Sequence, residues 1–96
     1  MNNKELIDKW SHKIEIGWYG FAIEGISDEW TNQIDEFLEY LNIQCPEFTI
    51  RQIKIKFGGL RIYVKYDKLK LQDNISSEIF DRIVRLEGLQ DEKLIY

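Results

Sequence analysis

Basic side chains are concentrated in one stretch of an otherwise acidic chain. Residues 51–70 contain seven lysines and arginines and one acid, Asp67, so this stretch has a formal charge of +6. The whole chain of 96 residues carries −4, which leaves −10 for the remainder. A local excess of cations of this size favours interaction with an anion.

The order of residues in this stretch predicts two strands joined by a tight turn at Gly58-Gly59. Strand alternation then places one aromatic ring among several cations on the face opposite the core. The candidate ligand-binding residues are Lys54, Lys56, Gly58, Gly59, Arg61, Tyr63 and Lys65. Lysines attract anions, an arginine can grip a phosphate with two hydrogen bonds, and a tyrosine can stack on a base. The set predicts a nucleotide-like small ligand, with the glycine amides allowing close approach.

The same residues have an alternative interpretation as a solvated outer face. Lysines on the open side of a sheet also block edge-to-edge aggregation. Nucleic acid as the main partner is disfavoured, because a net charge of −4 repels a long polyanion outside the basic stretch.

The sequence contains no recognisable catalytic or metal-binding spacing. The single histidine, His12, and the single cysteine, Cys45, do not form a zinc-binding pattern. Cys45 precedes Pro46 with no histidine nearby, which indicates a buried or loop thiol rather than a nucleophile. There is also no P-loop and no nucleotide-binding glycine fingerprint. We therefore expect a non-enzymatic protein that needs neither a metal nor a cofactor.

A second candidate surface is an acidic helix. Ser27 stands where an N-cap is favoured, and Asp28 and Glu29 follow in the first turn. The apolar stripe of this helix consists of Trp30, Ile34, Phe37, Leu38 and Leu41, so we expect an outer surface that is wholly acidic. Through Glu36 and Glu39 it could bind a basic toxin or defence enzyme, as an immunity protein does. A solvated helix face is the alternative.

A last amphipathic helix should be capped by Asp73 or Asn74 and should end near Gly88. Its core stripe consists of Ile75, Ile79, Ile83 and Leu86. Phe80 and Val84 lie off this stripe, so either the helix is buried over a wide arc or these two residues form a partner surface. Such spare apolar residues and an exposed strand edge would allow a homodimer.

The remaining elements follow from hydrophobic period and turn signals. A short helix is expected over residues 4–11, and a paired strand over residues 19–24. In the hairpin, strands 48–57 and 60–66 should set Phe57 opposite Leu60, with the pairs Ile55–Ile62 and Ile53–Val64 beyond. Phe48 and Ile50 are out of phase with the later residues, which predicts a bulge near Arg51-Gln52.

These elements predict a single α+β domain over residues 1–96. A small antiparallel sheet, made of the central hairpin and a preceding strand, should pack against two amphipathic helices, beside the short N-terminal helix. No apolar run is long enough for an export signal or a membrane span, so we expect a cytoplasmic protein.

Part of the chain resembles a family of small uncharacterised phage and bacterial proteins. The likeness covers residues 19–66, from Tyr19-Gly20-Phe21 through Trp30 and Ile34-Asp35 to the hairpin. Family members carry a pattern like F-x-F-x-C-x-x-G-W-x-x-L-I-D-x-L, followed by V-K-E-K-F-G-G-L-R-F-Y. The hairpin from Lys56 to Tyr63 is similar to the K-F-G-G-L-R-x-Y motif.

Here Ile23 and Glu29 replace a cysteine and a glycine of that pattern, and the paired-cysteine tail of many members is missing, so no metal site is carried over. The frequent occurrence of such proteins on phages and mobile elements implies a role in phage–host conflict. The resemblance thus favours a phage-type protein that antagonises bacterial defence, through a nucleotide-like signal or a host defence protein.

Overall fold

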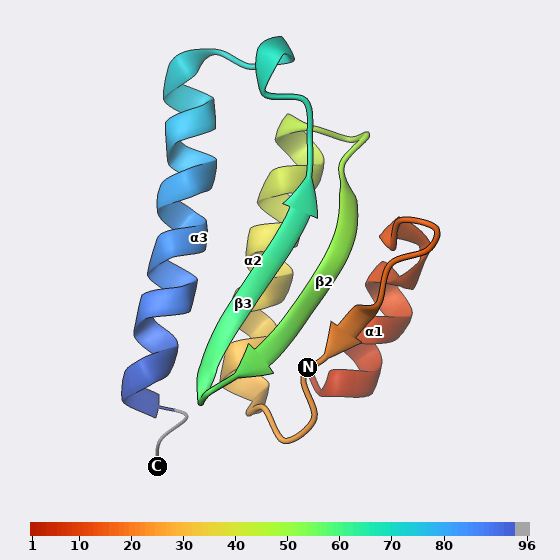
Figure 1. Ribbon diagram of the computed structural model, residues 1–96, viewed down its shortest axis with the longest axis vertical. Helices are drawn as coiled ribbons and strands as arrows, with labels where there is room; N and C mark the ends of the chain where they lie inside the picture. Colours follow the sequence, from red (N-terminus) through yellow and green to blue (C-terminus); the bar gives the residue numbers. More distant parts are fainter. Residues whose placement is uncertain (94–96) are drawn as a thin grey trace.

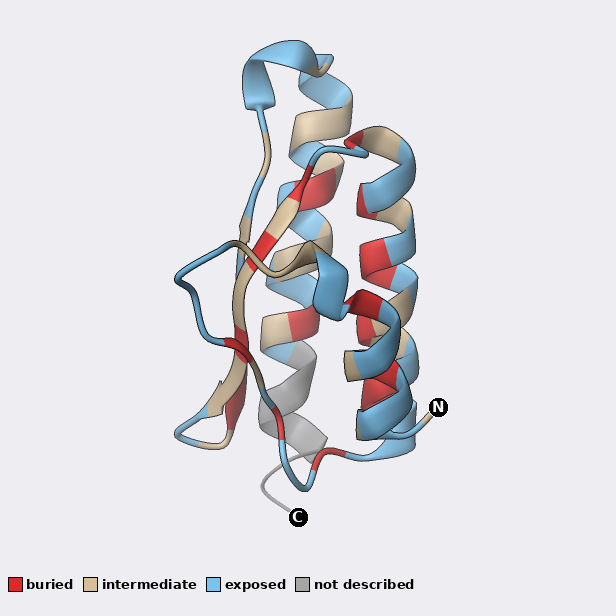
Figure 2. Ribbon diagram, turned by 90° about the vertical axis from the view of Figure 1, so that its right-hand side faces the viewer, coloured by how far each residue is buried: buried red, intermediate tan, exposed pale blue. Residues whose placement is uncertain are grey.

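The computed structural model describes the backbone of residues 1–93 and the side chains of residues 1–88. The elements in chain order are α1 (Asn3–Trp10), β1 (Gly20–Ala22), α2 (Asp28–Gln44), β2 (Thr49–Lys56), β3 (Gly59–Lys65) and α3 (Asp73–Lys93), with short 3₁₀ helices at Ser11–Lys13 and Lys68–Lys70. One sheet forms one layer, and the helices gather on one side of it (Figures 1 and 2). The predicted α+β fold, including the short N-terminal helix, is confirmed.

Helix α2 forms as its sequence predicts. The Ser27 hydroxyl accepts a hydrogen bond from the Trp30 amide, so the predicted N-cap is present. All five residues of the predicted apolar stripe are buried. The helix ends at Gln44, where the following Cys45 amide still bonds to the Leu41 carbonyl oxygen. Pro46 then stops the helical geometry.

The hairpin turn lies one residue earlier than predicted. Lys56 pairs with Gly59, so the two turn residues are Phe57 and Gly58, with φ values of 54° and 75°. Two positive φ angles are what a type I′ turn requires. Phe57 was expected to face Leu60 inside the core, but its residue surface is 91% exposed at the tip.

The strand pairing shifts with the turn. Ile55 pairs with Leu60 and Ile53 with Ile62, instead of the predicted pairs Ile55–Ile62 and Ile53–Val64. Each partner moves by two positions, so apart from Phe57, which is now in the turn, the side chains keep their predicted faces. The bulge predicted near Arg51-Gln52 is confirmed, because the register shifts between Ile50 and Gln52.

The sheet is mixed rather than wholly antiparallel. The strand order is β1-β2-β3, and β1 pairs with β2 in parallel, with Phe21 opposite Ile53. The prediction of an antiparallel first strand was therefore wrong. The connection from β1 to β2 contains α2, and a helical crossover of this kind returns the chain in the same direction. The first strand is also shorter than the predicted 19–24.

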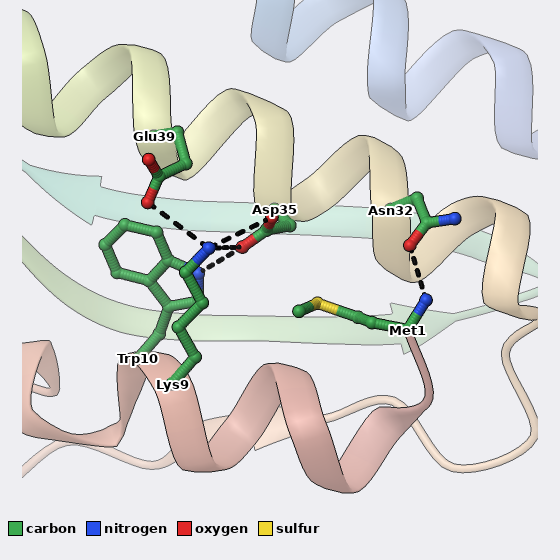
Figure 3. Close-up of polar contacts among 6 residues, drawn as sticks. All are labelled: Met1, Lys9, Trp10, Asn32, Asp35 and Glu39. Atoms are coloured by element: carbon green, nitrogen blue, oxygen red, sulfur yellow. Dashed lines mark hydrogen bonds and ion pairs between the residues drawn. The ribbon is translucent and has the colours of Figure 1, made fainter.

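Helix α1 is pinned to α2 by a carboxylate (Figure 3). Asp35 accepts a hydrogen bond from the Trp10 indole nitrogen at 2.8 Å and lies 2.9 Å from Lys9 Nζ. Glu39 lies 3.4 Å from the same amine, and the Met1 amine donates to Asn32. The outer surface of α2 was predicted to be wholly acidic, but Lys9 of α1 pairs with two of its carboxylates, Asp35 and Glu39.

Helix α3 is longer than predicted. It begins at Asp73, which puts this residue in the first turn rather than at the N-cap. It also continues through Gly88 to Lys93 instead of ending there. Of the predicted stripe, Ile79 and Leu86 are buried, and Ile75 and Ile83 pack partly buried against the core. None of the described helices is both long and apolar enough to cross a membrane.

Candidate functional site

The open face of the hairpin carries the predicted basic residues. Because the helices lie on the opposite side, this face of β2 and β3 is directed away from the helical layer (Figure 2). Gln52 pairs with Tyr63 across the strands, and Lys54 pairs with Arg61. The change of register left this grouping intact, so the sequence placed these side chains on the correct face.

Three cations at the turn end of this face have no carboxylate partner among the described side chains. Lys54 Nζ lies 5.7 Å from the centre of the Tyr63 ring, and Lys56 Nζ lies 5.4 Å from that of Phe57. The Arg61 guanidinium donates to the carbonyl oxygen of Leu60 at 2.9 Å. We call Lys54, Lys56, Arg61 and Tyr63 the cation–tyrosine cluster.

The other end of the face is an ion-pair cluster that the sequence analysis missed. Glu15 accepts a hydrogen bond from Arg51 Nε at 2.7 Å and lies 3.6 Å from Lys65 Nζ. The Arg51 guanidinium lowers the pKa of Glu15 below its ordinary value, and Lys65 adds a smaller effect of the same sign. Lys65 is therefore a weaker candidate for ligand binding than its position suggested.

The contact partners of Arg51 explain why sequence alone did not reveal this cluster. Arg51 is the extra residue of the bulge, so its side chain escapes simple alternation. Its guanidinium lies 4.8 Å from the centre of the Trp18 ring, and Glu15 is 36 positions away in the chain. Gly17 and the aromatic residues Trp18 and Tyr19 before β1 were the signals available for a loop here, but they did not indicate where it would fold.

The two candidate glycines differ in position. Gly58 lies in the turn with positive φ, and nothing lies within 4 Å of the place where a Cβ atom would stand. Gly59 is buried and paired with Lys56 in the strand ladder. A ligand therefore has room to approach the backbone at Gly58 but not at Gly59.

The residues predicted as partner surface do not form one surface. Glu36 lies with Arg82 and Arg85 in the lining of a hollow of about 170 Å³ between α2 and α3. Glu39 instead faces Lys9 of α1. Phe80 and Val84 on α3 are exposed, and Phe80 lines a separate groove beside β3.

Cys45 occupies a buried position next to the loop, in agreement with the sequence prediction. Burial raises the pKa of its thiol, which disfavours the reactive thiolate. His12 is exposed just after α1. Within residues 1–88, no group of three or more His, Cys, Asp or Glu side chains is arranged to hold a metal ion.

The chain was compared with protein families, curated proteins and solved structures. No family model matches the chain, and no curated protein or solved structure matches it significantly.

Proposed function

We propose that this protein is a non-enzymatic binding protein that takes up a nucleotide-like anion on the open face of its hairpin. Lys54, Lys56 and Arg61 contact the phosphates, and Tyr63 stacks on the base. The Gly58 amide lies at the turn end of the same face. In the form suggested by the sequence resemblance, the ligand is a signal of bacterial defence, and a phage-type protein sequesters it.

The observation that carries this proposal is the pairing of Lys54 with Arg61 on the open face. Like charges directly opposite one another on neighbouring strands destabilise a sheet. Carboxylates relieve the equivalent repulsion at the other end of the face, where Glu15 lies against Arg51 and Lys65. At the turn end no described carboxylate plays this part, and a bound phosphate would do so.

The geometry also fits an anion with a flat group. Tyr63 is 47% exposed and lies two residue pairs along the strands from the Lys54–Arg61 pair, on the same face. A base stacked on its ring therefore places the attached phosphates over the cations. The guanidinium of Arg61 already points a donor at an oxygen atom, the Leu60 carbonyl, and could exchange it for a phosphate oxygen.

Isothermal titration calorimetry with cyclic di-AMP and ADP-ribose tests the proposal. Arg61→Gln and Lys54→Gln should each weaken binding by about tenfold or more, because each removes a charge-assisted hydrogen bond. Lys70→Gln, in the exposed 3₁₀ helix away from the open face, is the matched control and should leave the affinity unchanged. Circular dichroism verifies that all variants fold.

Two results would contradict the proposal. One is the absence of heat with every nucleotide tried. The other is an equal loss of affinity in Lys70→Gln and Arg61→Gln, which would mean that the total charge matters and the cluster does not.

A second candidate function is inhibition of a basic toxin or defence enzyme through α2. The observation in its favour is that Glu36 is exposed beside a hollow on the helical side of the molecule. A Glu36→Lys/Glu39→Lys double variant should then fail to capture a protein from host lysate, while Arg61→Gln still captures it. Loss of capture with Arg61→Gln alone would refute this alternative.

A further inference from the structure

The free edge of β3 borders an apolar groove. β3 is the last strand of the sheet, and α3 packs beside it, diverging from it toward the Lys65 end (Figure 1). The space beside this end is a groove of about 350 Å³. It is lined by Trp18, Arg51, Ile62, Tyr63, Val64, Tyr66, Lys68, Phe80 and Ile83. We call it the edge groove.

At the turn end of the same edge, main-chain groups of β3 already have hydrogen-bond partners. Glu87 of α3 accepts a hydrogen bond from the Ile62 amide at 3.0 Å, and Arg61 donates to the Leu60 carbonyl oxygen. Main-chain groups two residues apart in a strand point to the same side. The amide and carbonyl of Val64 are therefore directed at the edge as well. They lie next to the edge groove, two residues along the strand from the Ile62 amide that Glu87 binds.

The side chains of the edge groove present a surface that an extended chain could cover. Phe80 is 62% exposed although it is a large aromatic residue, and Tyr63 and Trp18 are each nearly half exposed. They stand on either side of the edge, one on α3 and two on the open side of the sheet. A strand added to β3 would bury its alternate side chains against these rings.

The charge of the groove indicates which kind of chain would fit. Its charged lining residues are Lys68 and Arg51, the latter paired with Glu15, and no acid among the described side chains lines it. An antiparallel self-pairing centred on Tyr63 would set Arg61 opposite Lys65 of the copy, and repulsion between these like charges disfavours that register. An acidic strand meets no such repulsion there.

We propose that the edge groove binds an extended, acidic segment of a different protein, which adds to β3 as a fourth strand. Its main chain pairs with Val64, its apolar side chains cover Phe80 and Tyr63, and its carboxylates meet Lys68 and Arg51. This site shares Tyr63 with the cation–tyrosine cluster but does not need its cations Lys54, Lys56 and Arg61, since it uses the edge of β3 rather than its open face.

The test is a nuclear magnetic resonance titration of the isotope-labelled protein with synthetic peptides. The first probe alternates valine and glutamate over ten residues, and the second replaces each glutamate by lysine. A third replaces each valine of the first by proline, which keeps the charge and removes amides that pair with a strand. The first peptide should shift the amides of Ile62, Val64 and Tyr66 saturably, and the other two should not.

Two variants localise the effect. Phe80→Glu changes an exposed residue, so the fold is retained, and it should weaken binding of the acidic peptide by about tenfold or more. Ile43→Glu changes an equally exposed apolar residue on α2 outside the groove and should leave binding unchanged.

Four results would overturn the proposal: no binding of the acidic peptide, equal binding of the lysine peptide, equal loss in both variants, or shifts that lie outside residues 62–66. A concentration-dependent dimer in sedimentation, with shifts of the same amides in the absence of peptide, would assign the edge groove to a second copy instead.

Discussion

Phe57 is the residue whose conformation is least expected from its type. It occupies the first position of a type I′ turn with φ of 54°, where asparagine and glycine are preferred. A bulky side chain at positive φ is disfavoured by contact between its Cβ atom and the backbone. Its ring makes its described contact with the Lys56 ammonium group and is otherwise exposed to solvent. The turn therefore stores backbone strain that the ring does little to offset.

Phe57→Asn should stabilise the protein by about 1 kcal/mol, because asparagine tolerates the left-handed region better. Urea denaturation followed by fluorescence measures the change. Phe57→Ala is the control: it removes the ring but keeps a Cβ atom at positive φ, so its stability should stay close to that of the wild type. If the asparagine variant were the least stable of the three, contacts of the ring would outweigh the backbone strain.

At the scale of elements, the loop before β1 is attached to the bulge of β2 by Glu15. The Glu15 amide bonds to the Ile50 carbonyl oxygen at 2.9 Å, and its carboxylate bonds to Arg51. This double attachment holds Trp18 over Arg51 and so builds one wall of the edge groove. An ion pair that orders a loop in this way should also make stability depend on pH.

The pKa of Glu15 is lowered by folding from its ordinary value of 4.5. A carboxyl with a lowered pKa stabilises the fold above its unfolded pKa, and this contribution is lost as the pH falls through the folded value. Glu15→Gln should therefore lower the free energy of unfolding at neutral pH. Its difference from the wild type should shrink as the pH falls below about 4.5.

Urea denaturation over this pH range measures the difference, with Glu24→Gln at an exposed residue as the matched control. The account would be contradicted if Glu15→Gln destabilised the protein equally at neutral and at acid pH. The charge of the Glu15 carboxylate would then make no contribution to stability.

Several elements could be predicted because the information is local. Ser27 and the apolar stripe after it define α2, and the phase change at Ile50 reveals the bulge. The position of the turn could not be predicted from the sequence, because a turn at Phe57-Gly58 and a turn at Gly58-Gly59 place every strand residue on the same face. The alternation of apolar and polar residues therefore favours neither turn. The two glycines were chosen because glycine adopts positive φ more readily than phenylalanine does.

Long-range contacts were the part that the sequence could not supply. Nothing local shows that β1 runs parallel to β2, since pairing direction depends on how α2 crosses the sheet. Asp35 and Trp10 are 25 positions apart, and their hydrogen bond joins α2 to α1. Asp35 is one of the acids that had been assigned to a wholly acidic surface of α2. The candidate site was therefore predicted at its turn end and not at its Glu15 end.

At the scale of the whole molecule, the charges are separated by layer. The basic residues Lys54, Lys56 and Arg61 lie on the open face of the sheet, and α2 supplies acids to the other side. Opposite charge on the two sides orients an approaching anion toward the open face, although the net charge is negative. It also keeps the cation–tyrosine cluster distinct from Glu36, so variants of one surface leave the other unchanged.

The most direct test of the central claim is to map a bound nucleotide on the protein. In a nuclear magnetic resonance titration with cyclic di-AMP, the proposal predicts saturable shifts that are largest at the amides of Lys54, Gly58, Arg61 and Tyr63. These shifts should be absent in Arg61→Gln. The claim would be contradicted if no amide shifted, or if the largest shifts fell on α2 or on the edge groove at Val64 and Tyr66.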